Sequence, residues 1–260
     1  DCDPDARDRS ESYVLEFDDR FNFCDSSFRD LDQFSSAGEF DGILMDLGIS
    51  SFQLMEPVKG FSFRLDAPID MRLDPRVGQS AAEFLETASY ESLVRAVREY
   101  GEEKRWRRVV EAIIQARGTG LLSRTMSAAE MVSNAVGGRN FRQRIHPATK
   151  TFQGIRIAIN GELEALAVTL PKAFRALKEG GVLAVISFHS LEDRIVKRFM
   201  RKMAGRPESK YDGRAQQDRI VCAKLNGSKA IFPSKEEVEN NPRSRSARLR
   251  FLTKLKQPEL

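Results

Sequence analysis

The residues that first suggest chemistry follow an apolar run at 41–48, which ends in Asp46 and Gly48. Ser50, Ser51 and Gln53 follow shortly after it. Such a run is typical of a buried parallel strand, and open α/β sheets bind their ligands at the carboxyl ends of these strands. A carboxylate at that point can bind a ligand or accept a proton. The alternative is an ordinary strand-to-loop turn in which Gly48 supplies flexibility.

A second apolar run, at 181–188, leads through His189 into a helix. Ser190 and Asp193 have the spacing of a capping box, which predicts that the helix begins there. The box does not explain His189, although a lone histidine is more often a hydrogen-bonded structural residue than a catalyst. The two histidines and three cysteines lie far apart in the sequence, so we expect no metal site.

Three further segments, at 60–64, 70–72 and 146–153, are rich in aromatic, cationic and polar residues. Exposed aromatic rings beside arginines can stack on bases and hold phosphates. Core phenylalanines and a solvated first turn of a helix are the competing explanations. Arg156 and Asn160 lie four residues apart and therefore share one helix face.

Periodicity and capping signals predict the elements that must position these residues. Helices are predicted at 4–17, 102–117 and 162–178, and strands at 21–24, 41–48, 181–188 and 247–253. Asp3 and Pro4 suit the start of the first helix, and Gly180-Gly181 reads as a helix stop. Helix, glycine stop and buried strand in succession indicate a βαβ unit and a parallel sheet.

The middle of the chain has a different pattern. Between about 78 and 145 we predict helices and no strand, with capping boxes at Ser80 and Ser127. A helical block between two parts of a parallel-sheet domain indicates an insertion. The sequence therefore predicts an α/β fold with an inserted helical region.

Composition limits the class of protein. Hydrophobic residues make up 41% and charged residues 31%, as in soluble globular proteins. No run approaches the roughly 20 apolar residues of a membrane-spanning helix, and the three scattered cysteines fit a reducing, cytoplasmic setting. The net charge is only +4, but basic residues cluster at 194–206 and 243–256. Such clusters favour a phosphate-bearing partner, and the alternative is a solvated helix face.

Eight segments together carry a resemblance to a known family. They occur in this order: 1–6, 41–53, 60–63, 70–72, 100–103, 146–153, 187–197 and 241–249. Through them the chain closely resembles, over essentially all 260 residues, the bacterial S-adenosylmethionine-dependent methyltransferases that modify the N4 amine of a cytosine in 16S (small-subunit) ribosomal RNA. The resemblance implies a truncated Rossmann-like class I methyltransferase sheet at 1–60 and 147–260. It also implies an inserted all-helical substrate-recognition domain at 61–146.

The resemblance also implies roles for individual residues. The positions that match the family's cofactor-binding residues are Asp1, Phe28, Asp46 and Gln53. We hypothesise that Asp46, or a carbonyl of the loop after it, accepts a hydrogen bond from the attacking amine. The candidate contacts to ribosomal RNA are Arg64, Arg72, His146, Lys150, Arg156, His189 and Arg194. A homodimer stays open.

One departure from the family concerns the start of the chain. The family opens with a strand and a glycine-rich loop that contains Gly-Gly-His, whereas Gly-Gly pairs occur here only at 137–138 and 180–181. We therefore expect that an N-terminal portion is missing and that the chain as given is inactive without it. Two other classes remain open: a non-catalytic RNA-binding or assembly factor, and a nucleotide-dependent oxidoreductase that binds a dinucleotide.

Overall fold

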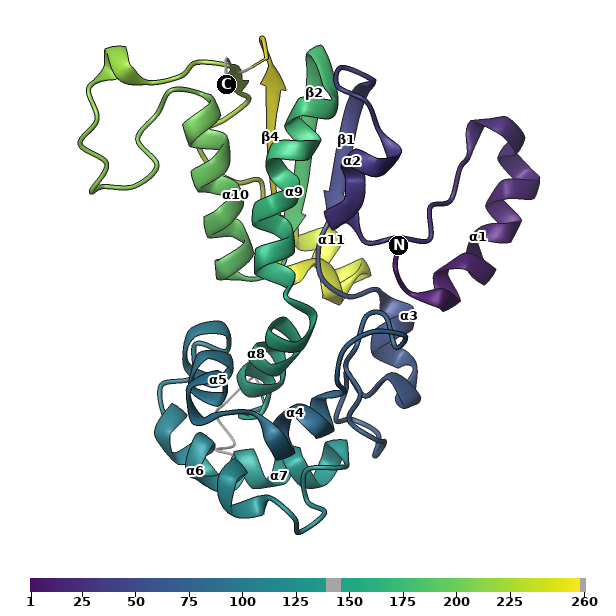
Figure 1. Ribbon diagram of the computed structural model, residues 1–260, viewed down its shortest axis with the longest axis vertical. Helices are drawn as coiled ribbons and strands as arrows, with labels where there is room; N and C mark the ends of the chain where they lie inside the picture. Colours follow the sequence, from purple (N-terminus) through teal and green to yellow (C-terminus); the bar gives the residue numbers. More distant parts are fainter. Residues whose placement is uncertain (139–145, 258–260) are drawn as a thin grey trace. The chain divides into compact units, whose positions relative to one another are not determined.

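The computed structural model describes residues 1–138 and 146–257 and contains two compact units. The helical unit consists of Asp1–Asp25 and Ile49–Glu162. The sheet unit consists of Ser26–Gly48 and Leu163–Leu260. Each unit is thus built from two separate stretches of the chain, which Figure 1 shows by colour. The protein is a mixed α/β protein.

The sheet unit is organised around a four-stranded mixed sheet with the order β1-β2-β4-β3. The strands are β1 (Phe40–Asp46), β2 (Leu177–Ser187), β3 (Ala223–Leu225) and β4 (Arg248–Lys254). β1 and β2 are parallel, with Asp46 opposite Ile186, while β4 runs antiparallel to both β2 and β3. The parallel pair confirms the predicted sheet, and its two strands end at the same edge.

Two helices cover one face of this sheet, as Figure 1 shows: α9 (Glu162–Ala176) and α10 (Ser190–Met203). Their apolar side chains pack with alternate residues of the strands. Members of this core include Leu166, Leu170 and Phe174 of α9, Val196 and Met200 of α10, and Leu183, Val185 and Leu252 of the strands. The period of two in β2 explains why successive side chains alternate between this core and the other face. The shorter helices of this unit are α2 (Leu31–Phe34) and α11 (Lys235–Asn240).

The helical unit has no named strand among its described residues. Its helices are α1 (Pro4–Phe17), α3 (Ser51–Met55), α4 (Ala81–Thr87), α5 (Tyr90–Val94), α6 (Trp106–Ala116), α7 (Thr125–Ala135) and α8 (Thr149–Asn160). The predicted apolar face of α6 forms the middle of the core, where Val109, Val110 and Ile113 are fully buried. This confirms the predicted helical character of the middle of the chain, as far as it is described; residues 139–145 of that prediction lie outside the described ranges.

Two glycines allow α8 to lie against a π-helical turn, η4 (Arg95–Tyr100). A Cβ atom added at Gly154 would lie 2.0 Å from the carbonyl oxygen of Ala96. At Gly101 it would lie 2.6 Å from the carbonyl oxygen of Lys150. Backbone approach this close leaves no room for a side chain. The segments at 100–103 and 146–153 therefore meet each other in the helical unit.

Several predicted element boundaries hold. Asp3 caps α1, its Oδ1 accepting from the Asp5 amide at 3.0 Å, and Pro4 begins the helix. Ser80 opens α4 with a complete capping box. The predicted tail strand is β4, although Leu252 and Lys254 in it are fully buried.

Other predicted boundaries are wrong. Residues 21–24 form no strand, and the helix predicted from Ser127 begins earlier, at Thr125. The Ser127 hydroxyl donates to the carbonyls of Leu121 and Arg124 instead of capping.

The predicted glycine stop also proved to be something else. α9 ends at Ala176, and Gly180-Gly181 lies inside β2. The register between β1 and β2 shifts at this point, between Phe40 and Gly42. Gly180 takes a φ of +84°, a conformation that favours glycine. The two glycines therefore lie where the pairing of β1 and β2 is irregular, and they do not end the helix.

The compact units divide the chain differently from the predicted domains. The described part of 61–146 lies in the helical unit, which also takes in Asp1–Asp25, residues 49–60 and α8. α8 belongs there because Phe152 and Ile155 pack into that core. No helix in the described ranges is both long enough and apolar enough to cross a lipid bilayer.

Candidate active site

The carboxyl ends of β1 and β2 form the candidate site in the sheet unit. Asp46 is the last residue of β1, and Ser187 is the last residue of the neighbouring parallel strand. The loops that follow approach each other, because a Cβ atom added at Gly48 would lie 3.8 Å from the Phe188 ring. Gly48 has a φ of +91°, so the turn after β1 favours glycine. Parallel strand ends of this kind are where open α/β sheets bind ligands.

The Asp46 carboxylate has no salt-bridge or hydrogen-bond partner among the residues that the structure describes. Partial burial among the strand ends raises its pKa above the ordinary aspartate value, and the negative charge of Glu192 raises it further. A carboxylate that lacks a cationic partner and has a raised pKa is a candidate for proton transfer.

His189 belongs to the cap of α10. Its Nδ1 accepts from the Glu192 amide at 3.4 Å, and Glu192 Oε2 accepts from the amides of His189 and Phe188 at 3.3 and 2.8 Å. His189 Nε2 also lies 3.1 Å from Glu192 Oε1. The capping box is thus formed by His189 and Glu192, and the predicted box of Ser190 and Asp193 is wrong. These contacts place His189 in the helix cap and orient Glu192, while the buried His189 Nε2 makes no hydrogen bond with the residues that the structure describes.

Phe28, the predicted cofactor aromatic, lies in the same unit. It begins a short 3-10 helix, Phe28–Asp30, that is tied to α9 because the Thr169 hydroxyl donates to the Phe28 carbonyl at 3.3 Å. The residue is 44% exposed, which is high for phenylalanine, so it is accessible to a ligand.

The other two predicted cofactor residues, Asp1 and Gln53, lie in the helical unit and meet through Asp3. The amide of Asp3 donates to Asp1 Oδ1 at 2.9 Å, and Gln53 Nε2 donates to Asp3 Oδ2 at 2.8 Å. Gln53 is buried, and its Oε1 accepts from the Ser50 amide in a capping box. Lys59 Nζ completes the group at 2.7 Å from Asp3 Oδ1.

Sequence reasoning missed the central role of Asp3 and the whole role of Lys59. Asp3 is fully buried, and the hydrogen bonds from Lys59 and Gln53 outweigh its desolvation, so that its pKa is lowered. Only the helix cap of Asp3 left a signal in the sequence. The contact with Lys59 joins residues 56 positions apart, and no local pattern announces it.

The segments at 60–63 and 70–72 form a tight structural junction. A Cβ atom added at Gly60 would lie 2.4 Å from the carbonyl oxygen of Pro68. Met71 is buried with a φ of +60°, and its carbonyl accepts from Asn160 Nδ2 at 2.8 Å. Arg72 is held by Asp70, its Nε and Nη2 donating at 2.8 and 2.7 Å. The predicted RNA contact Arg72 therefore has a structural role in this junction.

Three further predicted RNA contacts also make contacts within the helical unit. The His146 ring lies 4.6 Å from the Phe63 ring, and Lys150 Nζ donates to the Glu102 carbonyl at 3.2 Å. Arg156 makes a two-bond ion pair with Glu162 at 2.8 and 2.9 Å. Arg64 is exposed, and the described residues provide no ion-pair partner for its side chain.

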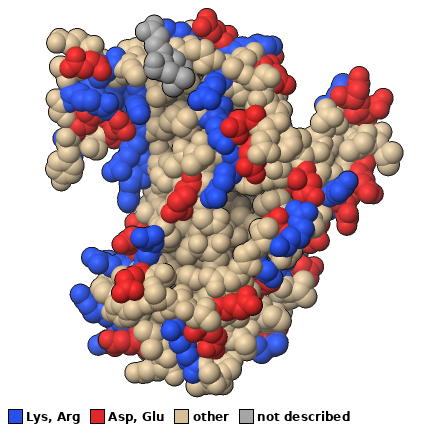
Figure 2. Space-filling view, viewed as in Figure 1, with Lys and Arg blue, Asp and Glu red and all other residues tan. Residues whose placement is uncertain are grey.

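Arg194, the last of these candidates, lies on α10 in the sheet unit and is exposed. Figure 2 shows lysine and arginine side chains following this helix. The acidic residue next to it, Asp193, is bound from β4: Arg250 Nε donates to Asp193 Oδ1 at 2.6 Å, and the Arg248 guanidinium lies 3.5 Å from Oδ2. Asp193 therefore joins α10 to the sheet.

The chain is similar in sequence to known proteins along nearly its whole length. Residues 1–255 match the MraW methylase family. The chain is 48% identical to ribosomal RNA small subunit methyltransferase H of Nitrosococcus oceani, over 91% of this chain and 76% of that protein. Proteins of the same name from Thermomicrobium roseum (43% identical, 96% of this chain, 77% of that protein) and Nitrosomonas eutropha (44%, 98% and 82%) are similar along nearly the whole chain. The family implies a Rossmann-like methyltransferase fold. With a match of this extent, the chain belongs to the MraW methylase family.

Proposed function

We propose that this protein transfers a methyl group from S-adenosylmethionine to the N4 amine of a cytosine in small-subunit (16S) ribosomal RNA. The observation that carries the proposal is the unpaired Asp46 carboxylate at the shared end of two parallel strands, in a chain of a methylase family. The names of the similar proteins support small-subunit ribosomal RNA as the substrate.

Residues of the sheet unit fit S-adenosylmethionine. Its sulfonium is a cation, and Asp46 and Glu192 make the strand edge negative. The exposed ring of Phe28 offers an apolar face to an adenine. When bound, the cofactor supplies a methyl group on positive sulfur, and that carbon–sulfur bond breaks as the amine nitrogen forms its new bond to carbon.

Asp46 acts on the amine. The nitrogen lone pair of a cytosine N4 amine is delocalised into the ring, so the free amine attacks weakly. We assign to the Asp46 carboxylate, or to a carbonyl of the loop after it, the acceptance of a hydrogen bond from the amine. That hydrogen bond favours the pyramidal form of the nitrogen, and the Asp46 carboxylate receives the proton that the methylated amine releases. The raised pKa of Asp46 brings its basicity closer to neutral pH than that of an ordinary aspartate.

The helical unit is our candidate for substrate recognition. A cytosine must be unstacked before its amine can be reached, and proteins recognise such bases in single-stranded or looped RNA. Arg64 is exposed on this unit and is free to contact RNA. Arg72, Lys150 and Arg156 instead bind other residues of the unit. We assign them a structural role, in which they fix the conformation of the surface that RNA contacts.

Nucleoside analysis by mass spectrometry tests the proposal. The full-length gene product is incubated with small ribosomal subunits and S-adenosylmethionine labelled in the methyl group. The labelled nucleoside is expected to be N4-methylcytidine. Label in another nucleoside, or none in the RNA, would reject the proposed reaction, and binding of NAD in place of S-adenosylmethionine would favour an oxidoreductase.

A further inference from the structure

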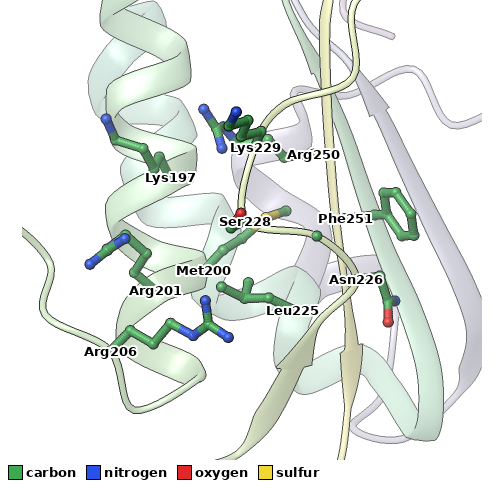
Figure 3. Close-up of a pocket in the computed structure, with 11 residues that line it drawn as sticks. Lys197, Met200, Arg201, Arg206, Leu225, Asn226, Ser228, Lys229, Arg250 and Phe251 are labelled. Atoms are coloured by element: carbon green, nitrogen blue, oxygen red, sulfur yellow. The ribbon is translucent and has the colours of Figure 1, made fainter.

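A basic groove runs along the second half of α10 in the sheet unit. Figure 3 shows it between α10 on one side and the connection from β3 to β4 on the other. Its lining includes Lys197, Met200, Arg201, Arg206, Leu225, Asn226, Gly227, Ser228, Lys229, Arg250 and Phe251. All of these residues lie in the sheet unit, so the groove is complete within it.

The lining has five cationic side chains and no carboxylate. Arg250 is neutralised by Asp193. The other four, which we call the groove cations, are Lys197, Arg201, Arg206 and Lys229. No carboxylate in the described ranges makes a salt bridge with any of them. Four cations gathered without a salt bridge repel one another, and a bound anion would relieve that repulsion.

The groove also offers neutral donors. The hydroxyl of Ser228 lies on the loop that forms one wall, as Figure 3 shows. The amides of Gly227, Ser228 and Lys229 donate to no other residue in the part of the chain described. Hydroxyls and backbone amides of this kind are common partners of phosphate oxygens in nucleic acids. The apolar floor, Met200 and Leu225, gives no hydrogen bonds that would select a base edge.

The cations form a row and not a single point. Lys197 and Arg201 lie one helical turn apart, about 6 Å along α10 at 1.5 Å per residue. A row fits a polyanion better than one small anion. Counted from Ser190 at the start of the helix, these two residues lie about 10 and 16 Å along the axis from the end of β2. The groove is therefore separate from the strand edge that carries Asp46. The distance between them is short enough for a few nucleotides of one RNA strand to span.

We propose that this groove holds the phosphodiester backbone of the substrate RNA beside the modified cytosine. The inference rests on the proposed function and adds a second anchoring surface to it. The groove cations contact phosphates, so they contribute affinity without sequence selection. They act on the binding of RNA and leave the chemical step at Asp46 unchanged.

Salt-dependent binding tests the inference. We would replace the groove cations together, as Lys197→Gln, Arg201→Gln, Arg206→Gln and Lys229→Gln. The matched control replaces four exposed basic residues of the sheet unit that lie outside both basic clusters, as Arg175→Gln, Lys210→Gln, Lys224→Gln and Lys235→Gln. Binding of a single-stranded RNA from the small subunit is followed by fluorescence anisotropy between 50 and 200 mM salt, in the full-length protein, with melting temperatures as a check on folding.

The groove variant is expected to bind about 10- to 100-fold more weakly at low salt. Its slope of log affinity against log salt should be shallower by about 2 to 3, since each contact to a phosphate of single-stranded RNA contributes about 0.7. The apparent KM for RNA should rise while kcat at saturating RNA stays near the unmodified value. The control should change the slope by less than 1.

Three results would overturn the inference. One is an equal loss of RNA affinity in the control variant, which would mean that RNA is attracted by the overall positive charge of the surface and not by the groove. Another is an unchanged slope in the groove variant while the unmodified protein methylates RNA normally, which would reject the groove and leave the proposed function intact. The third is competition by inorganic phosphate at micromolar concentration, which would identify a small-anion site. Absence of methyl transfer by the unmodified protein would instead reject the proposed function.

Discussion

Two aspartates, one in each compact unit, differ in how the fold treats their charge. Asp3 in the helical unit is fully buried, caps α1 and is bound by Lys59 and Gln53, and its pKa is lowered. Asp46 in the sheet unit reaches solvent and has no cationic partner among the described residues, and its pKa is raised. Burial disfavours the charged form of both carboxylates. Only Asp3 has partners that reverse the effect.

The difference separates a structural carboxylate from one available for chemistry. A paired and hydrogen-bonded carboxylate stabilises the fold while it is charged, and protonation removes that contribution. An unpaired carboxylate with a raised pKa contributes nothing comparable to the fold. Its basicity remains available to a substrate.

The largest effect is expected from Asp46→Asn on methyl transfer. Loss of a general base lowers turnover by roughly 10²- to 10⁴-fold. The control is Asp41→Asn, which changes an exposed aspartate of the same strand that pairs with Lys178 and should leave turnover within about twofold. Both are measured as single-turnover rates at saturating RNA. Equal rates for the two variants would contradict a special role for Asp46 in methyl transfer.

Asp3→Ala should lower the free energy of unfolding by about 3 kcal/mol. It removes a helix cap, at about 1 kcal/mol, and leaves the buried Gln53 without its partner and Lys59 with Asp5 alone, at about 1–3 kcal/mol. Asp5→Ala is the control, because Asp5 pairs with the same Lys59 but is 55% exposed and should lose less than about 1 kcal/mol. Urea unfolding measures both, and similar losses would contradict the buried role of Asp3.

The packing of the helical unit predicts a further loss of about 1–3 kcal/mol for Gly154→Ala. The added methyl group would meet the Ala96 carbonyl, so α8 and η4 must move apart. Gly213→Ala, in the sheet unit, has open space around it and should change stability by less than about 0.5 kcal/mol. If thermal unfolding leaves the Gly154 variant as stable as the control, the close approach is not needed for the fold.

The smallest effect is expected on the pH dependence of the unfolding free energy. Because the pKa of Asp3 is lowered in the fold, its stabilising contribution is complete above the ordinary aspartate pKa and is lost as the pH falls through the lowered value. The difference in unfolding free energy between the unmodified protein and Asp3→Ala should therefore be constant near neutral pH and shrink in acid. A difference that grows as the pH falls would contradict the pairing.

The sequence was informative where local chemistry decides structure. Apolar runs predicted β1 and β2, Asp3 and Ser80 predicted helix starts, and the period of α6 predicted its buried face. Those features depend on residues within a few positions of one another.

Long-range contacts account for what was missed. Ser190 and Asp193 have the right spacing for a cap, yet Asp193 is drawn to Arg250 of β4 and the cap passes to His189 and Glu192. Lys59 meets Asp3 across 56 residues, and Gly180-Gly181 follows the register of the sheet. The candidate site was likewise only partly predictable from local sequence. The position of Asp46 at the end of an apolar run singled it out, but its lack of a partner depends on contacts that form only in the folded chain.

The pH dependence of single-turnover methyl transfer tests the central claim most directly. The rate of the unmodified protein should fall as the pH is lowered through a value above the ordinary aspartate pKa, because protonated Asp46 cannot accept from the amine. The residual rate of Asp46→Asn should lack that fall. The same fall in both proteins, or a flat profile for the unmodified protein, would contradict a role for Asp46 as the acceptor.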